Sequence, residues 1–311
     1  MKELISAYQF IALNDLALIR RRLLDRARAL HLHGTVLIAP EGINFSLGGR
    51  SSALDAWLER LAGDGINRLV SHRQPVEVVP FLRLKVRIRS EIIAFEPSLD
   101  PGCTRTGEAL DPESWHRLLG EEDIQLVDTR NDYEVRIGSF RGAANPGIDR
   151  FTEFADWARV HLDPARPVAM FCTGGVRCEK ASARLLADGF DRVYHLRGGI
   201  LAYLQHFAGQ PSLWNGECFV FDDRVSVDPQ LRPSARPVCA GCRHPHDELP
   251  ANGMPPVNDQ GSCRLCQRHF DPDRLAGIAE RVRQIALARA RGVSHLGPQQ
   301  ADQAMPDSAP A

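Results

Sequence analysis

Long hydrophobic runs are absent from this chain of 311 residues. No stretch approaches the roughly 20 consecutive apolar residues that a membrane-spanning helix needs, so we expect no membrane partner. The first residues also lack the apolar segment of a secretory signal peptide. The net charge of -1 gives no general preference for nucleic acid. No motif for binding a flavin, a haem or a nicotinamide cofactor is visible.

What is present is the composition of an ordinary soluble protein, with 43% hydrophobic and 25% charged residues. The length suggests two or three domains. The chain has eight cysteines, four of which form two Cys-x-x-Cys pairs. A fifth lies in a glycine-rich turn described below. This usage is typical of metal binding and reactive thiols in a reducing compartment, which predicts a cytoplasmic protein.

One cysteine lies between a strand and a helix. The apolar run 167–171 predicts a buried strand, and the helical spacing of apolar residues over 179–188 predicts a helix that ends at Gly189. The turn between them consists of Cys172, Thr173, Gly174, Gly175, Val176 and Arg177. Such a turn points backbone N–H groups inward and places a helix N-terminus behind them. These groups and Arg177 would stabilise a thiolate at Cys172, although an inert buried cysteine is the simpler alternative.

A second cysteine and an acid–base pair accompany this turn. Cys178 lies six residues after Cys172. It either packs at the helix start or resolves an oxidised or persulfidated Cys172 by forming a disulfide. Asp128 follows another predicted strand, and parallel strands place such ends at one edge of a sheet. We expect Asp128 and Arg130 to brace the active loop through an ion pair.

The number of residues between the cysteine and the arginine indicates which group the loop can hold. Four residues separate Cys172 from Arg177, one fewer than in phosphatases with a cysteine–arginine loop, and the shorter loop suits a single sulfur atom. These residues resemble a rhodanese domain. The resemblance extends to three further segments, 124–130, 138–146 and 193–200.

A closer resemblance is carried by residues 172–182, which are similar to the rhodanese-related tRNA uridine hydroxylases. Three more segments fit that family: 39–44, 128–134 and 216–225. The resemblance implies hydroxylation of the wobble uridine (uridine 34) to 5-hydroxyuridine, with tRNA as partner through its anticodon loop and molecular oxygen as co-substrate. It also implies that Cys172, Arg177 and Cys178 are catalytic, with the Cys172 thiolate attacking C6 of the base. The alternatives are a thiosulfate or persulfide sulfurtransferase and a non-catalytic binding module.

The N-terminal region, 1–96, predicts a ferredoxin-like domain with the element order β-α-β-β-α-β. We expect strands over 5–13, 34–39, 44–47, 76–79 and 84–88, and helices over 16–30 (capped by Asn14) and 51–61. The turn 41–44 is either a hairpin turn that needs Gly42 or a loop that faces substrate. The first helix carries five arginines, which are either a solvated face or a phosphate-binding surface: Arg20, Arg21, Arg22, Arg26 and Arg28.

The remaining chain predicts a mixed α/β and α+β architecture. Residues 97–112 contain prolines and glycine and predict a linker. A short helix is predicted to begin at Pro112, where the linker ends. Residues 113–215 predict a rhodanese-like domain with a parallel sheet. Residues 216–292 predict a zinc-ribbon-like region with a helix over 275–290, and 293–311 a disordered tail. The sequence makes no prediction of the oligomeric state.

Two Cys-x-x-Cys pairs with 20 residues between them indicate a structural zinc site. Its ligands would be Cys239, Cys242, Cys263 and Cys266. Four thiolates complete a tetrahedron and leave no open position, so the zinc would stabilise the fold. The alternative is a pair of redox disulfides.

Overall fold

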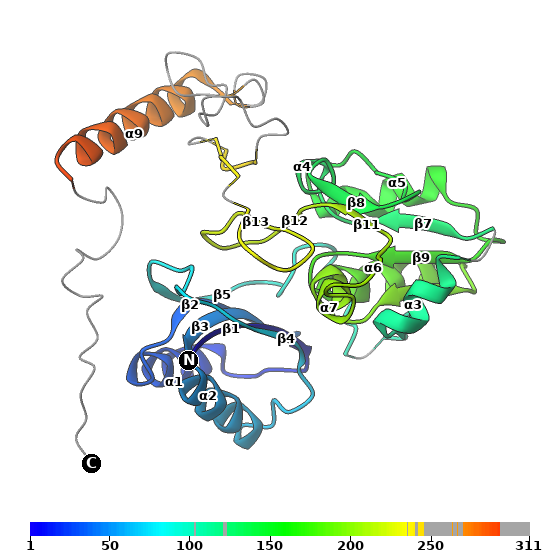
Figure 1. Ribbon diagram of the computed structural model, residues 1–311. Helices are drawn as coiled ribbons and strands as arrows, with labels where there is room; N and C mark the ends of the chain where they lie inside the picture. Colours follow the sequence, from blue (N-terminus) through cyan, green and yellow to red (C-terminus); the bar gives the residue numbers. More distant parts are fainter. Residues whose placement is uncertain are drawn as a thin grey trace. The chain divides into compact units, whose positions relative to one another are not determined.

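The computed structural model describes residues 1–102, 104–120, 123–234, 236–239, 242–245, 263, 266 and 270–292. Residue contacts divide the chain into two compact units, 1–235 and 236–311. The first unit contains two principal sheets, one of five strands and one of four (Figure 1). The mixed α/β architecture predicted from the sequence is confirmed.

The five-stranded sheet forms the N-terminal domain. Its elements are β1 (Lys2–Phe10), α1 (Leu16–Ala29), β2 (His33–Ala39), β3 (Gly42–Arg50), α2 (Ser51–Gly63), β4 (Val70–Pro75) and β5 (Leu84–Ile88). The spatial order of the strands is β4-β1-β3-β2-β5. Through β4 this is the predicted β-α-β-β-α-β order, and β5 is added in parallel beside β2.

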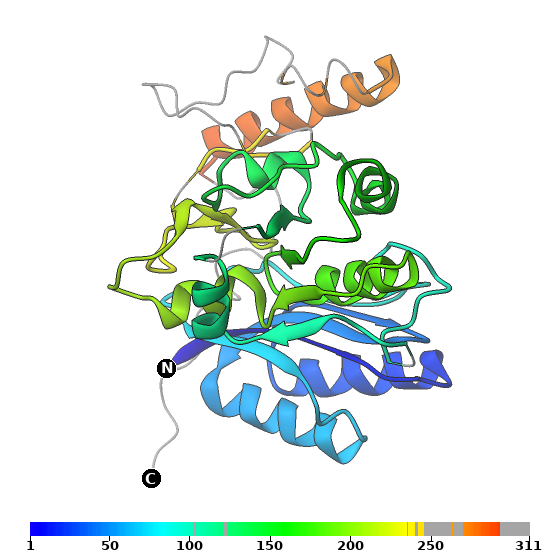
Figure 2. The same ribbon diagram turned by 90° about the vertical axis from the view of Figure 1, so that its right-hand side faces the viewer.

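The two faces of this sheet differ. Alternate residues such as Ile5, Val36 and Phe45 pack with Leu23 of α1 and Trp57 of α2 in one buried core. Figure 2 shows both helices on the same side of the sheet. The strand residues that alternate with these core residues therefore point to the opposite face of the sheet. That face lines the cavity described below.

Two local predictions in this domain need correction. The strand predicted over 76–79 lies earlier, at β4, where the buried residues include His72 and Gln74. The apolar pattern misplaced it because this strand presents polar side chains to the interior. The first helix is capped by Asp15 rather than Asn14, since the Asp15 carboxylate accepts a hydrogen bond from the N–H of Leu18.

The four-stranded sheet forms the second domain, with the order β6-β10-β9-β7. Its strands are β6 (Glu108–Leu110), β7 (Gln125–Asp128), β9 (Val168–Phe171) and β10 (Val193–Leu196), and all pairings are parallel, as predicted. The helices are α3 (Pro112–Leu118), α4 (Asp132–Val135), α5 (Phe154–His161), α6 (Val176–Ala187) and α7 (Gly199–His206). A 3-10 helix at Phe151–Glu153 precedes α5. The predicted linker is too long, because β6 lies inside it and pairs with β10.

Residues 214–234 complete the first unit. β11 (Trp214–Gly216) pairs with β8 (Gly138–Phe140), and β12 (Cys218–Phe219) pairs with β13 (Ser226–Val227). Trp214, Cys218 and Val220 pack in one core with Phe140. We predicted that the C-terminal region begins at 216, but these apolar contacts attach the segment to the first unit.

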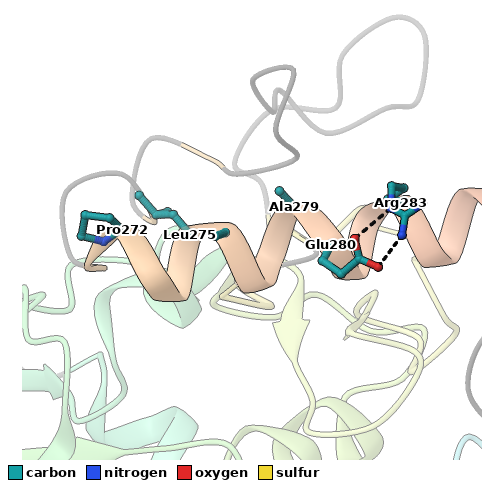
Figure 3. Close-up of a pocket in the computed structure, with 6 residues that line it drawn as sticks. Pro272, Leu275, Ala279, Glu280 and Arg283 are labelled. Carbon is teal, nitrogen blue, oxygen red and sulfur yellow. Dashed lines mark hydrogen bonds and ion pairs between the residues drawn. The ribbon is translucent and has the colours of Figure 1, made fainter.

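The second unit contains α9 (Pro272–Ala290), which corresponds to the predicted C-terminal helix. Ile278 packs with the cysteine cluster described below. On another part of the helix, Glu280 and Arg283 form an ion pair at 2.8 Å, shown in Figure 3. The predicted tail 293–311 lies outside the described residues. Among the helices that the structure describes, none has the length and apolar character needed to cross a membrane.

Candidate active site

The Cys172 turn joins β9 to α6, as the sequence predicts. Gly175 adopts a left-handed conformation (φ 99°), and its N–H donates to the Cys172 Sγ at 3.1 Å. The carbonyl of Cys172 accepts a hydrogen bond from the N–H of Ile200 at 2.9 Å. A Cβ at Gly199 would lie 2.4 Å from that carbonyl oxygen, so only glycine permits this approach. The Gly198–Gly199 turn therefore packs against the Cys172 loop and fixes its position.

The Cys172 thiol has an unusually low pKa. Burial raises this pKa. A side-chain hydrogen bond with Cys178, the charge of Arg177 and hydrogen bonds from backbone N–H groups outweigh the effect of burial and lower the pKa to about 6. Burial and the neighbouring Cys172 raise the pKa of Cys178 well above its ordinary value. Cys172 is consequently the thiolate of the pair, and Cys178 is the thiol that donates to it. The resolving role of Cys178 stays a prediction.

Arg177 is held by a carboxylate whose role the sequence does not predict. Glu134 of α4 accepts two hydrogen bonds from the Arg177 guanidinium, at 2.7 and 2.8 Å. The Glu134 side chain is fully buried and that of Arg177 is 6% exposed. Burial alone would raise the pKa of Glu134, but the charge of Arg177 keeps it below its ordinary value. The positive charge beside Cys172 is thus largely shared with this partner.

Asp128 and Arg130 form the expected ion pair. Arg130 donates to both Asp128 oxygens, at 2.8 and 2.6 Å, and to the carbonyl of Gly138. Ser139 donates to the same carboxylate at 2.7 Å. Both charged side chains are completely buried. Neither lines the cavity, so the pair supports the β7 end and does not face a ligand.

The N-terminal domain contacts the Cys172 loop directly. The hydroxyl of Tyr8 in β1 donates to Glu179 of α6 at 3.1 Å. Tyr8 also lies beside Gly175, where an added Cβ would lie 3.0 Å from its hydroxyl oxygen. Burial, then the charges of Glu179 and Cys172, raise the pKa of Tyr8. Tyr8 is therefore a neutral hydrogen-bond donor at the loop.

The turn at 41–44 is the hairpin turn between β2 and β3, and its last residue lines the cavity. A Cβ at Gly42 (φ 151°) would lie 2.2 Å from the carbonyl oxygen of Gln9, so the turn needs glycine. Glu41 points to the interior, where it forms an ion pair with Lys180 at 2.7 Å and accepts the N–H of Ile92 at 2.7 Å. Asn44 lines the cavity. The turn thus joins the domains and supplies one cavity residue.

A cavity of about 590 Å³ opens at Cys172 between the two sheets of the first unit. Its walls include the predicted loop residues Cys172, Thr173, Gly174, Val176 and Arg177. Tyr8, Leu37 and Asn44 line it from the N-terminal sheet, and Phe221 lines it from the segment after β12. Phe221 is 64% exposed, with the Arg177 guanidinium carbon 5.8 Å from its ring centroid. This volume lies within the roughly 300–1,000 Å³ typical of sites for small organic molecules.

The second unit brings four cysteines together. The sulfur atoms of Cys239, Cys242, Cys263 and Cys266 all lie within 4.8 Å of one another. Three of their separations are 3.5, 3.7 and 3.6 Å. Zinc bound tetrahedrally at about 2.3 Å would place sulfur atoms about 3.8 Å apart. The four thiols therefore fit a zinc ion, as the sequence predicts.

Comparison with known proteins identifies both domains of the first unit. Residues 2–92 match the UPF0176 acylphosphatase like domain, and residues 111–206 match the rhodanese-like domain. The chain thus carries a UPF0176 acylphosphatase like domain followed by a rhodanese-like domain.

Solved structures align with about a third of the chain. The rhodanese-like domain of the Alr3790 protein from Anabaena sp. shares 24% identity, covering 35% of this chain and 78% of that one, with a TM-score of 0.30. A rhodanese-like domain protein from Staphylococcus aureus shares 25%, covering 31% and 90%, with a TM-score of 0.26. A rhodanese-related protein from Thermoplasma volcanium shares 19%, covering 33% and 95%, also with a TM-score of 0.26.

Proposed function

We propose that this protein hydroxylates the wobble uridine of tRNA at C5, with molecular oxygen as the oxidant and the Cys172 thiolate as the nucleophile. The observation that carries the proposal is the cavity above Cys172. It holds about 590 Å³ and has apolar walls with a few polar groups. A nucleobase needs such a space, whereas a sulfur-donating anion needs only a small polar site over the loop.

The partner of Arg177 supports the same choice. A sulfurtransferase acting on thiosulfate would use this arginine to hold the anion. Here both guanidinium nitrogens that face Glu134 are already engaged by its carboxylate. An arginine paired in this way offers less attraction to a second anion. It still stabilises the Cys172 thiolate, which the hydroxylation requires.

The chemistry begins when the Cys172 sulfur forms a bond to C6 of the uracil ring. The C5–C6 double bond opens and C5 becomes nucleophilic. The overall reaction balances with two thiols as reductant: C5–H, oxygen and two thiols give C5–OH, water and a disulfide. Cys172 leaves C6 as the double bond re-forms. The base must be unstacked to reach the cavity, as a base of the anticodon loop can be.

The experiment that tests the proposal incubates the purified protein with tRNA and a thiol reductant, with and without oxygen. We expect 5-hydroxyuridine at the wobble position only when oxygen is present, measured by mass spectrometry of nucleosides. The alternative is a sulfurtransferase, which the rhodanese-like domain favours. Transfer of sulfur from thiosulfate to cyanide or tRNA, without uridine oxidation, would establish that alternative.

A further inference from the structure

A basic pattern in β5 and the residues beside it has no role in the site described above. Between 83 and 89, basic and apolar residues alternate strictly and no acidic residue occurs. The basic residues are Arg83, Lys85, Arg87 and Arg89, and the apolar residues are Leu84, Val86 and Ile88. Alternate residues of a strand point to opposite faces of its sheet. One face of this strand is therefore apolar and the other is basic.

The structure separates these faces as the alternation requires. Val86 is buried in the core beneath α1 and Leu84 packs against that core, whereas Lys85 and Arg87 are exposed. The ladder with β2 continues past both ends of the strand. The N–H of Gly34 donates to the carbonyl of Arg83 at 3.2 Å, and the N–H of Arg89 donates to that of Ile38 at 2.9 Å.

The basic face is continuous with the wall of the cavity. Lys85 lies opposite Thr35 and Arg87 lies opposite Leu37, and both β2 residues line the cavity. Beyond Leu37 the same row across the sheet continues to Asn44 and then to Tyr8 at the catalytic loop. Three strand spacings of about 4.8 Å separate β1 from β5, which gives about 14 Å. A chain that places one base beside Tyr8 and Cys172 therefore reaches the basic residues with its neighbouring nucleotides.

We propose that the basic face of β5, formed by Arg83, Lys85, Arg87 and Arg89, binds the phosphodiester backbone of the RNA strand whose base enters the Cys172 cavity. The proposal rests on the proposed function and adds the surface that holds the substrate. None of the ion pairs among the described residues involves these four side chains. Their charges are thus available to phosphates, which arginine and lysine bind well.

The arginines of α1 are less suited to this role. The helix covers the opposite face of the sheet from the cavity. Two of its arginines are already engaged, because Arg26 pairs with Asp64 and Arg20 donates to the carbonyl of Val86. Arg21 and Arg22 are exposed on the same helix. They provide a control of equal charge on the face of the sheet that points away from the cavity.

Edge strands also carry cations for a different reason. β5 ends the sheet, and charged side chains on an edge strand prevent it from pairing with another chain. That explanation accounts for lysines and arginines at an edge, but it does not require them to share a face with the cavity. It also predicts a different result on substitution: more self-association and unchanged RNA binding.

The test compares Lys85→Gln/Arg87→Gln with Arg21→Gln/Arg22→Gln in the full chain. Both variants lose two positive charges from exposed sites. tRNA affinity is measured against salt concentration by fluorescence anisotropy. For the β5 variant we expect weaker binding and a salt slope about 1.4 less steep, since each lost phosphate contact of a single strand removes about 0.7. For the α1 variant we expect the wild-type slope and affinity. Equal losses in both variants, or no loss in the β5 variant, would overturn the proposal.

Two further measurements keep the result specific. The pH dependence of Cys172 alkylation reports whether the site is intact, and it should match wild type in both variants. Vesicles of anionic lipid replace tRNA in a parallel titration. β5-dependent binding to vesicles with no β5 effect on tRNA would contradict the RNA assignment. If wild type hydroxylates tRNA while the β5 variant binds it normally, this inference fails and the proposed function stands. If wild type does not hydroxylate tRNA but binds it in a way that depends on β5, the proposed function fails and the binding surface inferred here stands.

Discussion

Lys180 and Glu41 form a buried ion pair that joins the two domains beside the Cys172 loop. Their charged atoms lie 2.7 Å apart, and Lys180 also contacts Glu91 at 2.5 Å. The Lys180 side chain is fully buried. One cation thus holds a carboxylate from the β2–β3 turn and another from the segment after β5. Because Lys180 lies on α6, close to Cys172 in sequence, this pair fixes the N-terminal domain relative to Cys172.

Replacement of Lys180 should weaken the fold more than replacement of either partner. Lys180→Met leaves two buried carboxylates without their cation, and we expect a loss of about 3–5 kcal/mol in the free energy of unfolding. Glu41→Gln keeps an acceptor for the N–H of Ile92 and leaves Glu91 on the lysine, so its loss should be smaller. Urea denaturation measures both. The Lys180→Met deficit should shrink at acid pH, where the carboxyl groups gain protons. A deficit independent of pH would contradict this account.

The reactivity of Cys172 should follow a thiolate with a pKa of about 6. The rate of alkylation by iodoacetamide should rise through that pH and level off by neutrality, with Cys172→Ser as the control for other thiols. Because the pKa in the folded protein lies below the ordinary value, the thiolate stabilises the fold. This contribution is fully present above the ordinary thiol pKa and is lost as the pH falls through about 6. A midpoint near the ordinary thiol pKa would contradict the assigned role of the loop.

Glu134 should affect the pKa of Cys172 through its ion pair with Arg177. Glu134→Gln leaves a buried arginine without a counterion, so we expect a loss of stability of about 3–5 kcal/mol. In the molecules that remain folded, the unshared charge of Arg177 should lower the pKa of Cys172 further. Alkylation at low pH should therefore accelerate. Glu59→Gln, an exposed site on α2, is the matched control. Slower alkylation in Glu134→Gln would show that the carboxylate acts on Cys172 in another way.

The Cys172 turn could be predicted from the sequence because its structure depends on local backbone geometry. A strand, two glycines, an arginine and a helix follow one another between 167 and 188, and the structure places them as predicted. The zinc site could be predicted from the Cys-x-x-Cys pairs for the same reason, since the spacing of ligands within each pair is a local property. The basic alternation over 83–89 was equally visible in the sequence, and only its position beside the cavity required the structure.

The contacts between the domains could not be predicted from local patterns. Tyr8 has the alternation of an ordinary strand residue, and nothing near it in sequence indicates Glu179. Glu134 lies between Tyr133 and Val135 in a short helix, and its partner is 43 residues away. The strand at 70–75 was missed because it buries His72 and Gln74. Both polar side chains are buried, and His72 lines the cavity between the domains, so the usual separation of apolar and polar faces does not hold in this strand.

The second unit should bind one zinc ion per chain through its four cysteines. Cys266→Ser removes one ligand, so purified protein should lose most of its zinc in elemental analysis. The circular dichroism signal of α9 should fall as well, because Ile278 packs against the cluster. Cys172→Ser removes a thiol elsewhere and should retain the metal. Wild-type protein without zinc, or with disulfides at these positions, would contradict the assignment.

The most direct test of the central claim follows the oxygen atom into the product. Purified protein is given tRNA, a thiol reductant and heavy-isotope oxygen gas in ordinary water, and the wobble nucleoside is examined by mass spectrometry. The account predicts 5-hydroxyuridine that carries the heavy isotope, formed by wild type and absent with Cys172→Ser. An unlabelled hydroxyl group, or the same product from Cys172→Ser, would contradict it.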